Sequence, residues 1–417
     1  MNKEINRGSK MRNVKRLVRS LKMRGIKGSI QRAAEGVSKV DLIGFWSFIV
    51  DQEKIPFNKT DYENNKEKGI TLNWVVPEMG KGSGGHINIF RFISYLERHG
   101  IHNRVYMYRA QLMLSNDVFR NFIKENFQIL DENVELYWDV RYMKYAHGIV
   151  ATSWETAYFV NRYDNVISKF YFIQDFEPDF YAKSSQYEFA ENTYKMGFRG
   201  LTAGEWLRDI CVNQYNMVAD SFSFSYDKDL YTVQPYTGRK NRVFFYARPV
   251  TPRRDFELGM LALNELCKRM PEIEVVFAGW NIDEYAIPFK YKSLGILELD
   301  KLSALYASCD VCLVISNTNL SLLPLEVMGS GSVAVCSKGA NSEWLVNESN
   351  SILVDYDPVQ IAETIEKYLK DTSLLNDIRE KGIEFAKSTS WEVEGEKVLK
   401  AVKRGIQEDE KNINNRG

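Results

Sequence analysis

The chain has 417 residues, which exceeds one ordinary hydrophobic core, so we expect two domains of roughly 150–200 residues each. Hydrophobic residues make up 44% and charged residues 26% of the sequence, as in soluble globular proteins. The formal net charge is +0, yet residues 1–35 contain eleven Lys and Arg against two acidic residues. The excess of basic over acidic residues is confined to this segment, and no recognised nucleic-acid-binding module follows, which argues against a nucleic-acid partner.

Residues 1–40 are predicted to form a basic arm that contains a short cationic amphipathic helix. Apolar residues recur at helical spacing in this arm, at Met11, Val14, Leu17, Val18 and Leu21. Lys and Arg occupy the other faces, so attachment to an anionic membrane surface is one interpretation, helped by the apolar run Leu42–Val50. A helix packed on the protein's own acidic body, or disorder, would explain the same pattern.

Several features bear on the compartment. The apolar run Leu42–Val50 has nine residues, whereas a membrane-spanning helix needs about 20. The charges of the arm continue past Lys27, which leaves no room for the apolar stretch of a secretory signal. The five cysteines are scattered, which fits a reducing compartment better than a disulfide framework. We therefore expect a cytoplasmic protein, peripheral at the inner face of the cell membrane if the arm binds lipid.

From Ile70 onward, short apolar runs alternate with helical stretches. A strand at 70–76, a loop at 77–85, a helix at 86–98 and a strand at 105–108 come first, and further apolar runs lie at 149–152, 169–173 and 201–203. Such alternation indicates βαβ units and a parallel sheet. The loop contains Gly84 and Gly85 before a helix start, where backbone can approach an anion closely. It matches neither a dinucleotide fingerprint nor a P-loop, and a simple turn remains an alternative.

The chain turns polar around residues 227–242, where Pro235 and Gly238 break regular structure, and we place a domain boundary there. A second series then follows, with strands at 242–247, 274–278, 311–315 and 332–337 and helices at 255–270, 302–308 and 324–329. A last amphipathic stretch, residues 391–407, is expected to pack back onto the first domain. Cys309 and Cys312 lead into the third strand and are interpreted as core cysteines. With four histidines in the chain, no metal site is expected.

Three residues of the second series are suited to a sugar nucleotide. Arg248 and Arg253 follow a strand directly, at the edge where open α/β sheets bind ligands, and arginines bind phosphate through several hydrogen bonds. Glu326 lies near the start of a helix after another strand, where a carboxylate can accept hydrogen bonds from sugar hydroxyls. Alone, the arginines could equally be a solvated surface and Glu326 part of an ion pair.

In this order, several motifs resemble the retaining GT-B glycosyltransferases of family four, and most closely the WsaF-type rhamnan-synthesis rhamnosyltransferases. The supporting stretches are MGKGSGGHINIFRF, FYFIQDFEPDFY, TAGEWLRD, ARPVTPRRDFELG, LGILELDKLSALYASCDVCLVIS, PLEVMGSG and STSWE. The resemblance implies two Rossmann-like domains facing a cleft, with a C-terminal helix crossing back to the N-terminal domain. Residues 41–235 with 391–417 would form the acceptor-side domain, and residues 240–390 the donor-binding domain.

The resemblance also implies roles for individual residues. Arg248 and Arg253 would bind the donor diphosphate and stabilise the leaving group. Glu326 matches the second Glu of the family's E-x7-E motif and would hold the ribose. Gly295 and Ile296 would contact the base through backbone groups, and Gly84 and Gly85 would approach the pyrophosphate. Asp175, Glu177, Asp179 and His86 are candidates for acceptor contacts, with Asp175 the foremost catalytic candidate among them.

One position departs from the family pattern. The first Glu of E-x7-E should fall at position 318, which is Thr318 in this chain. Its usual contact to the donor sugar is therefore absent or supplied differently, which a deoxysugar donor would tolerate best. The leading hypothesis is metal-independent transfer of L-rhamnose from dTDP-L-rhamnose to a growing polysaccharide or lipid-linked glycan. Another donor such as a UDP-hexose, or a degenerate membrane-associated scaffold, are the alternatives.

Overall fold

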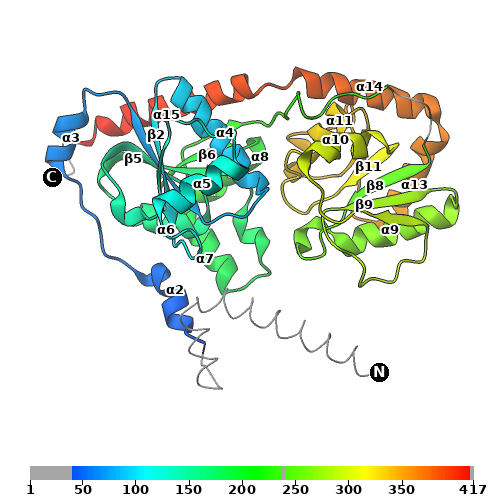
Figure 1. Ribbon diagram of the computed structural model, residues 1–417, viewed down its shortest axis with the longest axis horizontal. Coiled ribbons are helices and arrows are strands. Elements are labelled where there is room, and N and C mark those ends of the chain that lie inside the picture. The colour runs from blue at the N-terminus through cyan, green and yellow to red at the C-terminus, as the bar shows by residue number, and fades with distance from the viewer. Residues whose placement is uncertain (1–39, 236–237, 239, 414–417) are drawn as a thin grey trace. The chain divides into compact units, whose positions relative to one another are not determined.

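The computed structural model describes residues 40–235, 238 and 240–413, so the basic arm up to residue 39 lies outside the described residues. Two compact units are formed, one by Met1–Phe172 with Gly405–Gly417 and the other by Ile173–Arg404 (Figure 1). By contacts the chain therefore divides at residue 172, whereas the second sheet begins at Arg242, directly after the polar segment where a boundary was expected. No described helix has the length and apolar character needed to cross a bilayer.

The first unit contains parallel strands that are neighbours in the order β3-β2-β1-β4-β5. Its strands are β1 (Thr71–Pro77), β2 (His102–Tyr108), β3 (Glu135–Tyr137), β4 (Ala146–Ala151) and β5 (Val166–Ile173), and its helices are α2 (Leu42–Val50), α3 (Lys59–Asn65), α4 (Gly84–Arg98), α5 (Asn116–Asn126), η1 (Val140–Tyr142) and α6 (Trp154–Arg162). The interior of β1 is buried without alternation, as expected for a parallel strand that is covered on both faces. The helix expected from His86 begins two residues earlier, at Gly84.

The end of the chain returns to the first unit, as the sequence predicted. The helix α15 (Trp391–Glu410) begins in the second unit, and its residues from Gly405 belong to the first. There the Ser168 hydroxyl donates to the Gly405 carbonyl at 3.2 Å, and the Tyr62 hydroxyl donates to Glu410 at 3.2 Å.

The second unit contains a parallel sheet in the order β10-β9-β8-β11-β12-β13, together with the parallel pair β6 and β7. Its strands are β6 (Arg199–Ala203), β7 (Ala219–Phe222), β8 (Arg242–Tyr246), β9 (Glu274–Ala278), β10 (Tyr291–Ser293), β11 (Val311–Val314), β12 (Val333–Ser337) and β13 (Ile352–Val354). Its helices are η2 (Glu177–Phe180), α7 (Ser185–Thr193), α8 (Glu205–Tyr215), η3 (Pro252–Arg254), α9 (Phe256–Arg269), α10 (Leu299–Ala307), α11 (Leu323–Gly329), α12 (Ala340–Glu343), α13 (Pro358–Lys370) and α14 (Thr372–Ser388).

Local sequence explains how this sheet is covered. Asp357 accepts hydrogen bonds from the backbone of Val359 and Gln360, and Pro358 occupies the first turn, so α13 has a well-formed start. The apolar stripe of α13 then packs beside α9 on one face of the sheet (Figure 1). Cys309 and Cys312 are buried, as expected for core residues.

The strand order brings two loops of the second unit together. Strands β8 and β11 are direct parallel neighbours in the middle of the sheet, with Val311 opposite Val243. Their carboxyl ends therefore lie at the same edge. The loop after β8 carries Arg248 and Arg253, and the loop after β11 carries Thr318 and leads into α11. This is the edge at which open parallel sheets bind ligands.

Candidate functional site

Hydrogen bonds join the loop after β8 to the loop after β11. The Asn317 backbone N–H donates to the Arg253 carbonyl at 2.9 Å, and the Ser316 hydroxyl donates to the same oxygen at 3.2 Å. The Arg254 guanidinium donates from Nη1 to the Asn319 carbonyl at 3.0 Å. These hydrogen bonds fix the two loops relative to each other. The loops carry Arg248, Arg253 and Thr318.

The Arg253 side chain has hydrogen-bonding capacity that the protein does not use. Its Nε is buried without a hydrogen-bond partner among the described residues, and its nearest carboxylate oxygen, Asp175 Oδ2, lies 3.8 Å away. The guanidinium lies 4.0 Å from the ring centre of Phe180. Burial lowers the pKa of Arg253 most, Asp175 opposes this, and the charge of Arg248 lowers the pKa further. A cation with free donors beside a second cation is suited to binding an anion.

Arg248 lies among aromatic side chains. Its Nη1 is 3.4 Å from the Tyr246 hydroxyl, and its guanidinium carbon is 5.6 Å from the ring centre of Trp280, the second residue after β9. The Gly279 backbone N–H donates to the Gly295 carbonyl at 2.7 Å, which ties the segment before Ile296 to the same end of β9. Gly295 has a φ of 62°, and Ile296 is 76% exposed. The structure therefore places the proposed base-contacting segment at the end of β9 that also carries Trp280.

Glu326 lies in the first turn of α11 and is half-buried. It accepts a hydrogen bond from the Tyr231 side chain, and burial together with the charge of Glu326 raises the pKa of Tyr231. Tyr231 stacks on Tyr306, with the ring centres 6.2 Å apart. The ribose candidate Glu326 is thus joined to an aromatic pair of the second unit.

Asp175 belongs to the same cluster. Its Oδ2 accepts a hydrogen bond from the Thr318 hydroxyl at 2.8 Å, and its Oδ1 accepts one from the Asn319 backbone N–H at 3.1 Å. The Asn319 side-chain amide also donates to the Gln174 carbonyl at 2.7 Å. Burial raises the pKa of Asp175, which is 8% exposed, while these hydrogen bonds and Arg253 act in the opposite direction. The foremost catalytic candidate of the sequence is therefore in contact with the position that departs from the family pattern.

The remaining candidates lie in the first unit, at the start of α4. Gly82 has a φ of 66°, and Gly84 is exposed with no atom within 4 Å of the position a Cβ would take. The Ser83 hydroxyl and His86 Nδ1 are 2.7 Å apart, and burial lowers the pKa of His86 to about 4. His86 is thus a neutral imidazole at pH 7. A role of Gly84 and Gly85 at the pyrophosphate stays a prediction.

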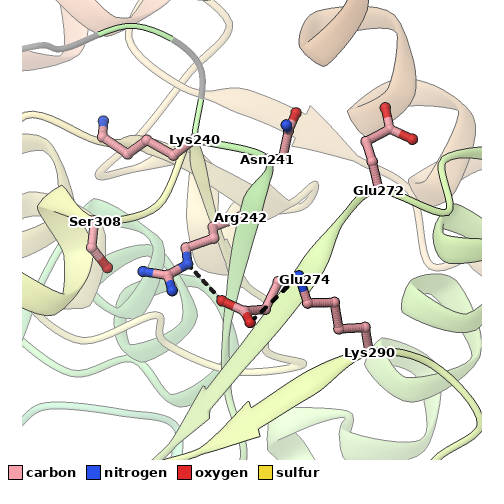
Figure 2. A pocket seen from close by; sticks show the side chains of 7 residues that line it. All are labelled: Lys240, Asn241, Arg242, Glu272, Glu274, Lys290 and Ser308. Atoms are coloured by element: carbon pink, nitrogen blue, oxygen red, sulfur yellow. Dashed lines mark hydrogen bonds and ion pairs between the residues drawn. The ribbon is translucent and has the colours of Figure 1, made fainter.

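A separate concavity of about 550 Å³ lies at the amino ends of the strands, opposite the edge that carries the arginines. Figure 2 shows its lining residues, Lys240, Asn241, Arg242, Glu272, Glu274, Lys290 and Ser308. Glu274 pairs with Arg242 at 2.6 Å and with Lys290 at 3.8 Å, so charges of both signs face one another here. None of the candidate site residues lines it. Within the described part of the chain, no group of three or more His, Cys, Asp or Glu could hold a metal ion.

Sequence reasoning missed the aromatic residues of the site. Tyr246, Trp280, Tyr231 and Phe180 each contact a charged candidate, but an aromatic residue in a sequence is most often a core residue. The signal that could have found two of them is position, because Tyr246 ends β8 and Trp280 follows β9 closely. Both therefore lie at the ligand-binding edge of the sheet.

Comparisons with known proteins agree with the motifs. The model of the WsaF C-terminal domain matches residues 241–366, and the model of the WsaF N-terminal domain matches residues 124–205. The O-antigen biosynthesis protein RfbC of Myxococcus xanthus is 30% identical over 341 residues, which cover 80% of this chain and 27% of that protein. The chain thus spans little more than a quarter of the length of this relative. The resemblance to WsaF is confirmed.

Solved structures support the fold. HepE from Anabaena, in complex with UDP and glucose, aligns with a TM-score of 0.60 at 14% identity over 80% of this chain and 99% of its own. Sucrose-phosphate synthase from Thermosynechococcus elongatus aligns with a TM-score of 0.59 at 12% identity over 80% of this chain and 98% of its own. At such identities the likeness establishes the architecture alone. The predicted α/β fold of the GT-B glycosyltransferases is confirmed.

Proposed function

We propose that this chain, which belongs to the WsaF family and has the GT-B fold of glycosyltransferases, transfers a sugar from a nucleoside diphosphate to a growing surface glycan. The observation that carries the proposal is the pair Arg248 and Arg253 at the carboxyl edge of the second sheet. The Arg253 side chain makes no hydrogen bond to the described residues, and both burial and the charge of Arg248 lower its pKa. A diphosphate would supply further negative charge and several hydrogen-bond acceptors to this pair.

The donor would lie along the contacts described above. Its diphosphate faces Arg248 and Arg253, its ribose hydroxyls face Glu326, and its base lies near Gly295 and Ile296. The Tyr231 hydroxyl donates to Glu326 and orients its carboxylate, which can accept hydrogen bonds from sugar hydroxyls. In this arrangement the arginines neutralise the leaving diphosphate, so the proposed transfer needs no metal ion.

The proposed chemistry is transfer with retention by attack on the face from which the diphosphate leaves. The bond between the anomeric carbon and the phosphate oxygen breaks while the acceptor hydroxyl oxygen bonds to that carbon. The proton of the acceptor hydroxyl passes to the departing phosphate oxygen, and Arg248 and Arg253 stabilise the charge that develops there. This leaves no protein base to be assigned in the transfer step.

We propose dTDP-L-rhamnose as the donor and a surface polysaccharide or lipid-linked glycan as the acceptor. Membership of the WsaF family supports the rhamnosyl donor, and the relative RfbC is named for O-antigen biosynthesis. A UDP-hexose is the second candidate, because the structural neighbour HepE was solved with UDP and glucose.

A panel of nucleotides tests the proposal. The melting temperature of the full chain should rise with dTDP and with dTDP-L-rhamnose, and mass spectrometry should detect transfer to a rhamnan oligosaccharide. A larger response to UDP and UDP-glucose would replace the donor while keeping the site. No response to any nucleoside diphosphate would refute the proposed function. Nucleotide binding without hydrolysis or transfer of any donor would identify a degenerate scaffold instead.

We further propose that the basic arm and α2 hold the protein at an anionic membrane surface. In α2, Phe48 is buried and Trp46 stacks on Trp154 at 6.3 Å, whereas Ile43 is 78% and Val50 73% exposed. Exposed apolar residues next to a segment rich in Lys and Arg suit a lipid surface. Flotation with phosphatidylglycerol vesicles should be lost on removing residues 1–39 and weakened by Ile43→Ser with Val50→Ser. Equal flotation of all forms, or equal binding to neutral phosphatidylcholine vesicles, would contradict this attachment.

A further inference from the structure

Thr318 occupies a position where a carboxylate is expected from the resemblance, and a carboxylate is indeed there, but it comes from another part of the chain. Thr318 is completely buried, and its hydroxyl donates to Asp175 Oδ2 at 2.8 Å. Asp175 follows β5 and is 143 residues earlier in the sequence. We infer that Asp175 supplies the carboxylate that position 318 lacks and that it acts on the donor sugar in the transfer step. This inference rests on the proposed function.

The geometry indicates that the carboxylate of Asp175 takes the place of the glutamate carboxylate expected at position 318. A glutamate at position 318 would place its carboxylate oxygens three bonds beyond Cβ. The threonine hydroxyl oxygen lies one bond beyond Cβ. Its hydrogen bond of 2.8 Å to Asp175 covers about the same distance as the two further bonds of a glutamate side chain. The Oδ2 atom of Asp175 therefore occupies roughly the place that such a glutamate carboxylate would reach. The Asn319 backbone N–H, which donates to Oδ1 at 3.1 Å, fixes the orientation of the carboxyl group.

A purely structural role would not require a carboxylate at this place. An asparagine could accept the Asn319 hydrogen bond through its carbonyl oxygen, while its amide donates to the Thr318 hydroxyl oxygen. Burial raises the pKa of Asp175, so a buried acid carries an electrostatic cost that an amide would not carry. The charge faces Arg253 at 3.8 Å without a hydrogen bond. The property that distinguishes aspartate from asparagine here is negative charge.

Negative charge has a use in the proposed reaction. As the bond between the anomeric carbon and the leaving phosphate oxygen breaks, positive charge develops on the anomeric carbon and the ring oxygen of the sugar. A fixed carboxylate beside the sugar stabilises that charge, while Arg248 and Arg253 stabilise the negative charge on the phosphate. The acceptor oxygen forms the new bond, and its proton leaves with the phosphate. Asp175 stays ionised and forms no covalent bond.

The test is a side-chain exchange between positions 175 and 318 in the full chain. The variants are Asp175→Asn, Asp175→Ser, Thr318→Glu and the double variant Asp175→Ser with Thr318→Glu. The assays measure kcat and KM with dTDP-L-rhamnose, the Kd for dTDP, and the melting temperature. The matched control is Asp310→Asn, which alters a fully buried carboxylate of the same unit that accepts backbone hydrogen bonds from Lys240 and Arg242 at the opposite edge of the sheet.

Specific results are expected. Asp175→Asn should lower kcat by about 100-fold or more, the usual effect of removing one group aimed at transition-state charge, with the Kd for dTDP within about threefold of wild type. Asp310→Asn should leave kcat within about twofold. Thr318→Glu alone should lower the melting temperature, because two carboxylates then face each other in a buried place. The double variant should recover stability relative to Thr318→Glu and at least tenfold in kcat relative to Asp175→Ser.

Three outcomes decide the matter. A wild-type kcat in Asp175→Asn would overturn the inference even if Asp175→Ser did not fold. A double variant no more active than Asp175→Ser would overturn it as well, because the carboxylate would then not be exchangeable. In both cases an active wild-type protein leaves the proposed function standing. A wild-type protein that neither binds nor turns over dTDP-L-rhamnose, UDP-glucose or their nucleotides would overturn both.

Discussion

Replacing Arg253 with glutamine should separate binding from stability. The Arg253 side chain makes no hydrogen bond to the described residues, and burial lowers its pKa, so the folded protein gains little from its charge. Glutamine keeps a polar side chain of similar reach but removes the charge and the multidentate donor set. The variant should therefore fold like the wild type and bind dTDP much more weakly.

The magnitude follows from the contacts. One hydrogen bond to a charged group contributes roughly 1.5–3 kcal/mol, which corresponds to a rise of about 10- to 150-fold in the Kd for dTDP. On the stability side, the contact with Phe180 at 4.0 Å is worth about 1 kcal/mol, and the largely buried pair with Asp175 at 3.8 Å adds to it. Relief of the repulsion from Arg248 offsets part of this loss. A net change of about 1 kcal/mol shifts the melting temperature by roughly 2–4 °C.

Isothermal titration calorimetry with dTDP and a thermal melt without ligand give both quantities. Arg242→Gln is the matched control, because Arg242 pairs with Glu274 at 2.6 Å at the opposite edge of the same sheet (Figure 2). Its Kd for dTDP should equal that of the wild type. The reasoning is refuted if Arg253→Gln binds dTDP with wild-type affinity, or if Arg242→Gln weakens binding as much as Arg253→Gln does.

Other substitutions probe the surroundings. Trp280→Ala should raise the Kd for dTDP about 2- to 30-fold, because its contact with Arg248 contributes roughly 0.5–2 kcal/mol; calorimetry with unchanged affinity would exclude this role. Burial raises the pKa of Asp255 to about 6, so the wild type loses stability as the pH rises from about 4 to 6. The variant Asp255→Asn removes this loss, so its melting temperature should rise above that of the wild type more at pH 7.5 than at pH 4. An equal gain in melting temperature at both pH values would contradict the raised pKa of Asp255. Gly259→Ala places a methyl group on the buried ring of Phe245 and should cost about 1–3 kcal/mol in urea unfolding, whereas a wild-type midpoint would show that the ring can move.

The sequence predicted the core strands well because each is a buried apolar run. Strands β1, β8, β9, β11 and β12 were all expected within a few residues of their observed bounds. The sequence missed β3, β7, β10 and β13. These strands have only three or four residues each, and β10 is largely exposed, so a local pattern is too short to mark them. Their existence depends on pairing with a neighbour that is distant in sequence. A local pattern cannot carry that information.

The candidate site was predictable where it depends on position after a strand. Arg248 and Arg253 follow β8, and Glu326 opens the helix after β11, so parallel order alone brings them to one edge of the sheet. The contacts that orient them were not predictable. The hydrogen bond between Thr318 and Asp175 joins residues 143 positions apart and needs the folded backbone frame to exist. The sequence indicated that position 318 lacks the expected carboxylate and that Asp175 is a catalytic candidate. It gave no sign that the two residues are in contact.

The charges of the site also constrain where Asp175 can act. The carboxylate of Asp175 lies near both Arg253 and Arg254, and burial lowers the pKa of these two arginines while raising that of Asp175. A bound diphosphate would relieve the mutual repulsion of the arginines, but any phosphate oxygen placed against Asp175 would add a repulsion between like charges. A diphosphate bound at the arginines would therefore place the sugar, rather than its phosphates, beside Asp175. In the proposed reaction that is the end of the donor on which positive charge develops, so the electrostatics that would bind the nucleotide also favour a carboxylate at this place.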